Sequence, residues 1–392
     1  MFNFVSRPFC AVLCMALCAC NQPNDKRAQN NDRNNIGTWK LVKDGDLKIP
    51  VDSISPNTTY VNVDYFKHLD SNYIAVTDQR NNNLNIYNLD SKRLSKRIHF
   101  ETEGRNGIGH FYIADFKSFD SILVRGDDHH TLYLMDSSGK RLTSYELKLP
   151  GFDQSRELWF SVNNKPIILN DQIFGVMNLK VKSDKYVFTD LPVYHYSLKE
   201  AKVQLVKQIR FPADYMNPKD NWAPYHWEPS VCRYRNGIAY SFPIGDSVYA
   251  YNPNDEKVTA HYVPGVAGYQ PAPSIKEPSM EELNNGAKNA YLNYLLRYDP
   301  YQNVFYRFVF RPVEKDEKYM DYFSAMLDKP ITVQILDADD FSVKGETDLK
   351  AKIHYFRDFF IGQDGLYISN NHSANPENSE GFISYSKFKI VK

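Results

Sequence analysis

The sequence predicts an all-β protein, and within that class a six-bladed β-propeller. The main observation is a short strand pattern that occurs six times, an apolar or aromatic alternation closed by a polar turn residue. Its copies are Leu84–Asp90, Leu132–Asp136, Val193–Ser197, Val248–Asn252, Val333–Asp337 and Phe382–Ser386. Alternation with a period of two is typical of strands with two unlike faces, and recurrence at intervals of several tens of residues indicates a repeat architecture. The composition agrees, because 28 Tyr and 24 Phe residues suit half-buried pleated surfaces.

Further strand patterns around each copy complete the blades. We expect strands at Tyr73–Thr77, Leu84–Leu89 and Lys96–Phe100 in the first blade, and at Ser121–Arg125, Leu132–Met135 and Leu142–Leu149 in the second. The third blade has Gln172–Val181, Tyr186–Thr189, Val193–Tyr196 and Ala201–Phe211, and the fourth has Val231–Tyr234, an Asn236-Gly237 turn, Ile238–Phe242, Val248–Tyr251 and Lys257–Val263. The fifth has Val304–Phe310, Ile331–Leu336 and Ser342–Thr347, and the last has Tyr355–Ile361, Leu366–Ser369 and Phe382–Val391. The intervals of several tens of residues between the six copies of the pattern suit four-stranded blades with loops.

The strand pattern at Trp39–Ile49, around a turn at Asp44-Gly45, belongs to no complete blade. We expect it to pair into the last blade, so that the ring closes and no strand edge stays open. The longest interval between copies, from Val248 to Val333, is long enough to contain a further blade. A propeller of seven blades is therefore the alternative. Residues 279–296 inside it read as a helix, because Ser279 and Glu282 make a capping-box pattern before apolar residues at helical spacing. We therefore expect a propeller over residues 37–392 with a helical insertion near 275–297.

Residues 1–19 read as a secretory leader, with Arg7 followed by an apolar run too short to span a membrane. The run ends Leu17-Cys18-Ala19-Cys20, which resembles the lipobox of bacterial lipoproteins. That resemblance implies cleavage before Cys20 and a lipid anchor on its sulfur; the alternative is an ordinary signal peptide in which Cys20 has no role. Residues 20–36 are asparagine-rich and charged, so beyond the lipidated cysteine they should form a disordered tether.

Charge and motifs exclude several classes of function. Lysine plus arginine and aspartate plus glutamate both number 47, so no long-range field favours nucleic acid. Cys232, the one cysteine beyond residue 20, reads as a small buried hydrophobe rather than a catalytic thiol. The run Asp127-Asp128-His129-His130 reads as a polar hairpin turn rather than a metal site. No recognised catalytic motif appears, and we expect no metal and no cofactor.

Two groups of residues are candidates for binding a ligand. A proline-punctuated aromatic loop suits sugars or peptides, with a core plug as the alternative; it holds Trp222, Tyr225, His226, Trp227 and Glu228. Arginines recur near strand ends, at Arg80, Arg105, Arg125, Arg233, Arg235, Arg297, Arg307, Arg311 and Arg357. Of these, Arg297 and Arg307, with His372 from the last polar loop, are our candidates for the mouth of the propeller, where an arginine can grip a carboxylate or phosphate.

Three stretches carry a resemblance to a known family. They are Arg297–Phe308 (RYDPYQNVFYRF), Gly365–Asn370 (GLYISN) and the glycine-rich Gly104–Phe111 (GRNGIGHF). With the lipobox and the length, they resemble an uncharacterised family of Bacteroidota lipoproteins described as TolB-like six-bladed propellers. The resemblance implies the fold and an outer-membrane lipoprotein facing the periplasm or the cell surface. It implies no activity and no catalytic residues.

Together these patterns favour a lipid-anchored propeller of the cell envelope that acts as a non-enzymatic binding or scaffold module. Its binding partner would be a glycan, a peptide or an envelope protein. The lipid on Cys20 would attach the module to the membrane. The alternative is a carbohydrate-active lyase or hydrolase of unrecognised type, with His226, Glu228 and arginines at the propeller mouth.

Overall fold

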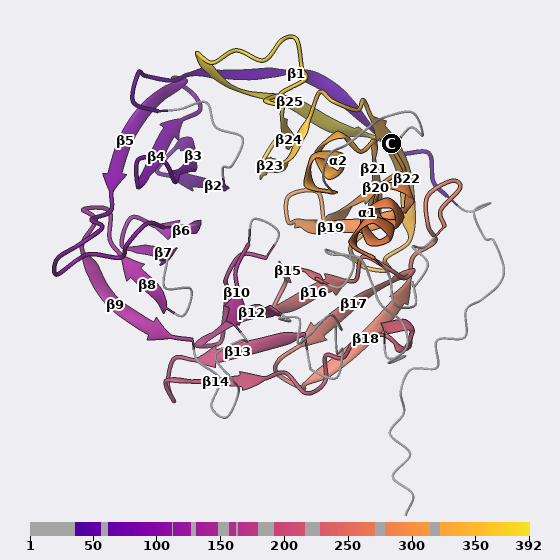
Figure 1. Ribbon diagram of the computed structural model, residues 1–392, viewed down its shortest axis with the longest axis horizontal. Helices are drawn as coiled ribbons and strands as arrows, with labels where there is room; N and C mark the ends of the chain where they lie inside the picture. Colours follow the sequence, from indigo (N-terminus) through magenta and orange to yellow (C-terminus); the bar gives the residue numbers. More distant parts are fainter. Residues whose placement is uncertain are drawn as a thin grey trace, which may run out of the picture. The chain divides into compact units, whose positions relative to one another are not determined.

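Six antiparallel sheets stand in a ring (Figure 1). The computed structural model describes residues 36–392 apart from 56–61, 112, 127–130, 148–156, 162–163, 179–191, 216–227, 271–278 and 314–321. Residues 32–392 form one compact unit, and it is this unit that contains the ring. Each sheet pairs its strands almost entirely in chain order, so each sheet is one blade. The fold is thus the six-bladed β-propeller that the sequence predicts.

The strands fall into the blades as follows. Blade one comprises β2 (Val63–His68), β3 (Ser71–Asp78), β4 (Asn83–Asn88) and β5 (Arg93–His99), and blade two comprises β6 (Ile113–Ser118), β7 (Ser121–Arg125), β8 (Thr131–Met135) and β9 (Arg141–Glu146). Blade three comprises β10 (Glu157–Trp159), β12 (Gln172–Asn178), β13 (Val193–Ser197) and β14 (Lys202–Leu205), with β11 (Ile167–Leu169) paired to β12. Blade four comprises β15 (Ser230–Tyr234), β16 (Gly237–Ser241), β17 (Ser247–Asn252) and β18 (Lys257–Tyr262), and blade five comprises β19 (Leu292–Asp299), β20 (Val304–Phe310), β21 (Ile331–Asp337) and β22 (Val343–Leu349). Blade six comprises β23 (Tyr355–Gly362), β24 (Gly365–Ser369), β25 (Phe382–Val391) and the N-terminal β1 (Lys40–Pro50).

Strand β1 closes the ring, as predicted. It pairs antiparallel with β25 from Lys40 opposite Val391 to Pro50 opposite Phe382. The register shifts between Lys43 and Asp46, so the Asp44-Gly45 dipeptide is a bulge within one strand, and the turn expected there was wrong. Because the first and last strands of the body share one sheet, the hydrogen bonds between β1 and β25 close the ring.

The helical segment is shorter than the sequence pattern indicates. Helix α1 (Met280–Asn289) begins with the predicted capping box, in which the Ser279 hydroxyl accepts from the Glu282 backbone N–H and the Glu282 carboxylate accepts from the Ser279 backbone N–H. Residues 292–299 are not helical but form β19, which pairs with β20 in blade five. An apolar run such as Leu292–Leu296 suits a buried helix or a buried strand equally, and pairing with a distant strand selects between them.

A second helix, α2 (Tyr322–Asp328), has no counterpart in the sequence prediction. The residue after it, Lys329, is buried, and its ammonium donates to the carbonyl oxygens of Lys288 at 2.8 Å, Ala290 at 2.9 Å and Arg311 at 3.2 Å. Burial lowers the pKa of Lys329 to about 7. This one side chain therefore ties the C-terminal end of α1 to the end of β20.

The predicted turn at Asn236-Gly237 lies one residue earlier. Tyr234 pairs with Gly237, so the two turn residues are Arg235, with a φ of 52°, and Asn236. Gly237 lies in β16, where a Cβ atom would be 2.2 Å from the carbonyl oxygen of Tyr251. The glycine is required by this close approach of two backbones rather than by the turn.

Candidate functional site

The innermost strand of each blade lies nearest the ring axis; these strands are β2, β6, β10, β15, β19 and β23 (Figure 1). Several of them carry charged residues, such as Asp64 in β2, Arg297 in β19 and Arg357 in β23. Alternation along β23 places Arg357, Phe359 and Ile361 on one face, because residues two apart in a strand point the same way. Chain segments far apart in sequence thereby bring their polar groups together.

One cavity, of about 190 Å³, lies among these strands, and we call it the channel pocket. It is lined by Asn62, Val63, Asp64, Tyr65, Lys165, Arg297, Arg357, Phe359, Phe360 and Ile361. These residues come from or beside β2, from the segment before β11, from β19 and from β23. In a ring of six blades, residues of blades one, three, five and six meet only at the axis.

Lys165 reaches from blade three to blade one. It belongs to blade three, yet its ammonium donates to the Val63 carbonyl oxygen at 2.6 Å and forms an ion pair with Asp64, both in blade one. The second oxygen of Asp64 accepts from the Phe116 backbone N–H at 2.8 Å. Because blade two stands between blades one and three, this bridge fixes the two sides of the pocket relative to each other.

Two arginines complete the cationic part of the channel pocket. The guanidinium of Arg297 donates to the Leu296 carbonyl oxygen at 2.7 Å and to the Ser230 hydroxyl at 3.2 Å, and lies 5.7 Å from the ring centre of Phe359. Burial lowers its pKa to about 10, so Arg297 stays cationic at neutral pH. Arg357 donates to the Tyr294 hydroxyl at 3.4 Å.

Buried carboxyl groups lie around the pocket. Glu228 accepts from the Asn164 amide at 2.7 Å and from the Ser161 hydroxyl at 3.1 Å, and burial raises its pKa although Arg357 acts in the opposite direction. Burial likewise raises the pKa of Asp115, which pairs with the Lys117 ammonium at 2.6 Å. Raised carboxyl pKa values are common at binding and catalytic sites.

The structure separates the sequence-predicted site residues into three groups. Arg297 lines the channel pocket, and Glu228 is close enough to Arg357 for that charge to affect its pKa. Cys20, Trp222, Tyr225, His226 and Trp227 lie outside the described residues, as does the Asp127–His130 run. Arg307 and His372 lie elsewhere, in the interior.

Arg307 and His372 have contacts typical of structural residues. Arg307 is fully buried and donates to the carbonyl oxygens of Gly245 at 3.0 Å and Val263 at 3.3 Å, which joins blades four and five. His372 is 1% exposed; its Nδ1 accepts from the Ala374 backbone N–H at 3.1 Å, so its Nε2 carries the proton and donates to the Leu327 carbonyl oxygen at 3.1 Å. We therefore leave both out of the site that we propose.

The structure agrees with the interpretation of Cys232 as a small buried hydrophobe. It is 7% exposed, and burial raises the pKa of its thiol to about 11, which keeps it protonated and unreactive at neutral pH. Among the described residues, no group of three or more His, Cys, Asp or Glu side chains has the arrangement of a metal site.

Sequence reasoning missed the contributions of Lys165, Asp64 and Phe359. The alternation Arg357, Phe359, Ile361 in the predicted strand was a usable signal for one wall of the channel pocket. Lys165 gave no local signal, because its position follows from a bridge to a residue about a hundred positions earlier.

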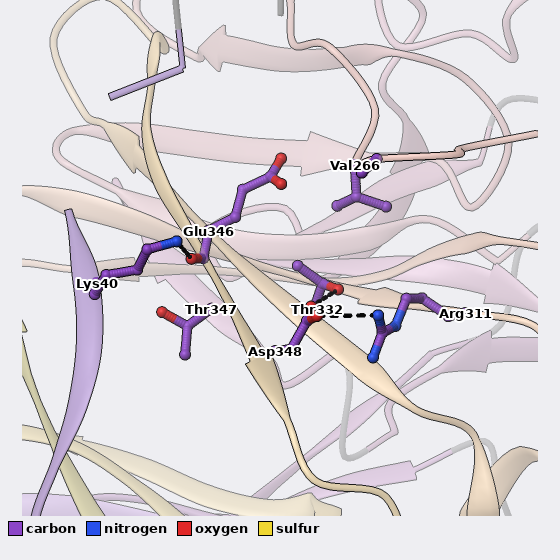
Figure 2. Close-up of a pocket in the computed structure, with 8 residues that line it drawn as sticks. Lys40, Val266, Arg311, Thr332, Glu346, Thr347 and Asp348 are labelled. Carbon is purple, nitrogen blue, oxygen red and sulfur yellow. Dashed lines mark hydrogen bonds and ion pairs between the residues drawn. The ribbon is translucent and has the colours of Figure 1, made fainter. Parts of the chain in front are cut away.

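A larger cavity, of about 270 Å³, lies beside β22 and the start of β1 (Figure 2). Its polar side chains contact one another: Arg311 pairs with Asp348 at 3.0 Å, Thr332 donates to the same carboxylate at 2.5 Å, and Lys40 donates to the Glu346 carbonyl oxygen at 2.6 Å. The Lys40 contact joins the closing strand β1 to β22, and the two contacts of Asp348 lie within blade five, so we interpret this cavity as part of the closure seam.

Comparisons with known proteins agree with the fold. A family model described as "Domain of unknown function (DUF4221)" matches residues 38–347. The crystal structure of a DUF4221 member from Bacteroides vulgatus superposes with a TM-score of 0.79 at 20% identity, covering 90% of this chain and 99% of that one. A candidate exported protein from Bacteroides fragilis superposes with a TM-score of 0.56 at 11% identity, covering 90% and 96%. No curated protein matches the chain.

Within the described residues, no helix is long and apolar enough to cross a membrane.

Proposed function

This chain belongs to the DUF4221 family, and from the geometry of its channel pocket we propose that it is a lipid-anchored binding module of the cell envelope. In this proposal the propeller holds a small ligand, or the end of a peptide, glycan or protein partner, at the ring axis and does not transform it. The anchor is Cys20.

The observation that carries the proposal is the convergence of four blades on one pocket. Its walls combine aromatic rings with a few placed polar groups, which is the composition typical of ligand sites. The groups are held by strands of blades one, five and six and by the bridge from Lys165 to Asp64. A pocket that is rigid before the ligand arrives binds it at a lower entropic cost.

The envelope location is supported by the leader and the lipobox-like Leu17–Cys20. The similarity in fold to a Bacteroides protein named as a candidate exported protein agrees with it. Replacing the acceptor, Cys20→Ser, should release the protein from the membrane fraction of expressing cells and abolish incorporation of a labelled fatty acid. Retention of the label in Cys20→Ser would contradict the anchor.

Binding at the ring axis is tested by a thermal-shift screen of the full-length protein against envelope glycans, peptides and small metabolites. A ligand that binds only the folded state raises the melting temperature. Phe359→Ala should reduce that rise, because Phe359 lines the pocket. Tyr262→Ala, which removes a half-exposed ring on β18, is the control and should leave the rise unchanged. Equal loss of the shift in both variants would contradict binding at the axis.

An enzymatic alternative is favoured by one observation. Burial raises the pKa of Asp358 to about 7, and a carboxyl that is protonated near neutral pH can act as a general acid. Burial also raises the pKa of Glu228. Incubation of each ligand that binds with wild-type protein, followed by mass spectrometry, distinguishes the two functions. A product that Glu228→Gln no longer forms would establish the enzyme.

A further inference from the structure

We infer that the ligand of the channel pocket presents an anionic end group, a carboxylate or a phosphate, next to a flat apolar part, and that Arg297, Arg357 and Lys165 select it. The inference rests on the proposed function and specifies its ligand class.

The first argument is charge. The pocket is lined by three cationic side chains, Lys165, Arg297 and Arg357, and by one carboxylate, Asp64, so cationic side chains outnumber carboxylates in its lining. The whole chain has a formal net charge of zero, so the excess is local. Charges interact more strongly in a partly desolvated site than in water. An anionic group would be attracted by this cationic lining, and a neutral sugar would not.

The second argument is preorganisation. The Leu296 carbonyl oxygen and the Ser230 hydroxyl orient Arg297, and the Val63 carbonyl oxygen and Asp64 orient Lys165. Cations that are already oriented lose little conformational freedom when a ligand binds. Carboxylates and phosphates suit guanidinium groups, which donate two parallel hydrogen bonds to such oxygens.

The third argument is the shape of the apolar wall. Phe359, Phe360 and Ile361 line the pocket from β23, and the ring of Tyr65 stacks on that of Phe360 with centroids 6.1 Å apart and planes 5° apart. At about 190 Å³ the pocket is smaller than the roughly 300–1,000 Å³ of typical small-molecule sites. It therefore suits one anionic group with a ring or a few carbons attached, such as the end of a longer partner.

Asp64 makes the inference testable in both directions. Its carboxylate pairs with Lys165 and so competes with an incoming anion for that ammonium. Asp64→Asn keeps an oxygen that can accept from the Phe116 backbone N–H but removes the negative charge. It should therefore tighten anion binding, whereas Arg297→Met and Arg357→Met should weaken it.

The experiment is calorimetric titration of the purified full-length protein with benzoate, phenyl phosphate and the neutral isostere benzamide. Benzoate or phenyl phosphate should bind and benzamide should not, and comparison of the two anions distinguishes a carboxylate site from a phosphate site. Arg297→Met and Arg357→Met should each weaken binding about tenfold or more, since charge-assisted hydrogen bonds are lost. Lys165→Met should also weaken it. Arg235→Met is the matched control, because Arg235 is half-exposed in a turn of blade four and pairs with Asp339 outside the pocket.

Each variant is first checked for an intact thermal unfolding transition; if an arginine variant fails to fold, Asp64→Asn and Lys165→Met still give opposite predictions. Equal binding of benzamide and benzoate would overturn the inference. So would binding that Asp64→Asn does not tighten, or no anion binding at millimolar concentration. A neutral saccharide that stabilises the protein through Phe359 would then preserve the proposed function and refute only the anionic ligand class.

Discussion

Asp358 provides a quantitative test of the interior next to the channel pocket. It lies on β23 between Arg357 and Phe359 and is 1% exposed. The Tyr385 hydroxyl donates to it at 2.9 Å. Burial raises its pKa from 3.8 to about 7, although the hydroxyls of Tyr385 and Ser369 act to lower it. The folded protein thus holds a proton that the unfolded chain has released.

The sign of the effect follows from proton linkage. Between pH 4 and 7 the folded state binds more protons at Asp358 than the unfolded state does, so this group costs increasing stability as the pH rises. A shift of this size corresponds to roughly 4 kcal/mol at pH 8, at about 1.4 kcal/mol per pH unit. Asp358→Asn removes the charge and keeps an oxygen that can accept from Tyr385. Its advantage over wild type should therefore grow by about 2–3 kcal/mol between pH 5 and pH 8.

The assay is urea unfolding of both proteins at pH 5, 6, 7 and 8, followed by circular dichroism. Asp364→Asn is the control: its carboxylate is 57% exposed and pairs with Lys387 at 2.5 Å in the same blade. Such an exposed pair contributes up to about 1 kcal/mol. A stability difference between Asp358→Asn and wild type that is independent of pH would refute a raised pKa at this position.

Three further predictions concern the fold. Ile49→Ala, in the fully buried part of β1, should lower the free energy of unfolding by about 2–5 kcal/mol, whereas Val42→Ala, at a 47% exposed position of the same strand, should change it by less than about 0.5 kcal/mol in urea titrations. Lys329→Met removes hydrogen bonds to three carbonyl oxygens and should speed amide hydrogen exchange in α1; unchanged exchange would contradict its role. Gly237→Ala should lower the melting temperature because of the 2.2 Å contact of its Cβ, whereas Gly381→Ala, whose nearest neighbour is 3.9 Å away, should not.

The parts of the fold that were predicted correctly depend on local patterns. Each of the six repeated patterns lies within a strand or largely overlaps one. The pattern Val248–Asn252, for example, lies within β17 (Ser247–Asn252). The closing strand was predicted because its pattern stood alone and a ring needs every edge paired. The capping box was predicted because its partners are three residues apart.

The parts that were missed depend on distant neighbours. The innermost strands β2 and β6 were absent from the prediction, because Asp64, Asp115 and Lys117 interrupt their apolar alternation. The charge of Asp64 is tolerated because it meets Lys165 of blade three, and that of Asp115 because it pairs with Lys117 in the same strand.

The sequence therefore contained the blade repeat and the isolated strand pattern that closes the ring, since each strand pattern is encoded in residues close together in the chain. It identified Arg297 as a candidate but not its partners. The channel pocket arises only when blades one, three, five and six close around one axis, where the ion pair of Lys165 with Asp64 joins residues about a hundred positions apart. Local patterns do not encode such contacts, because the free energy that stabilises them comes from desolvation and Coulomb attraction inside the assembled ring.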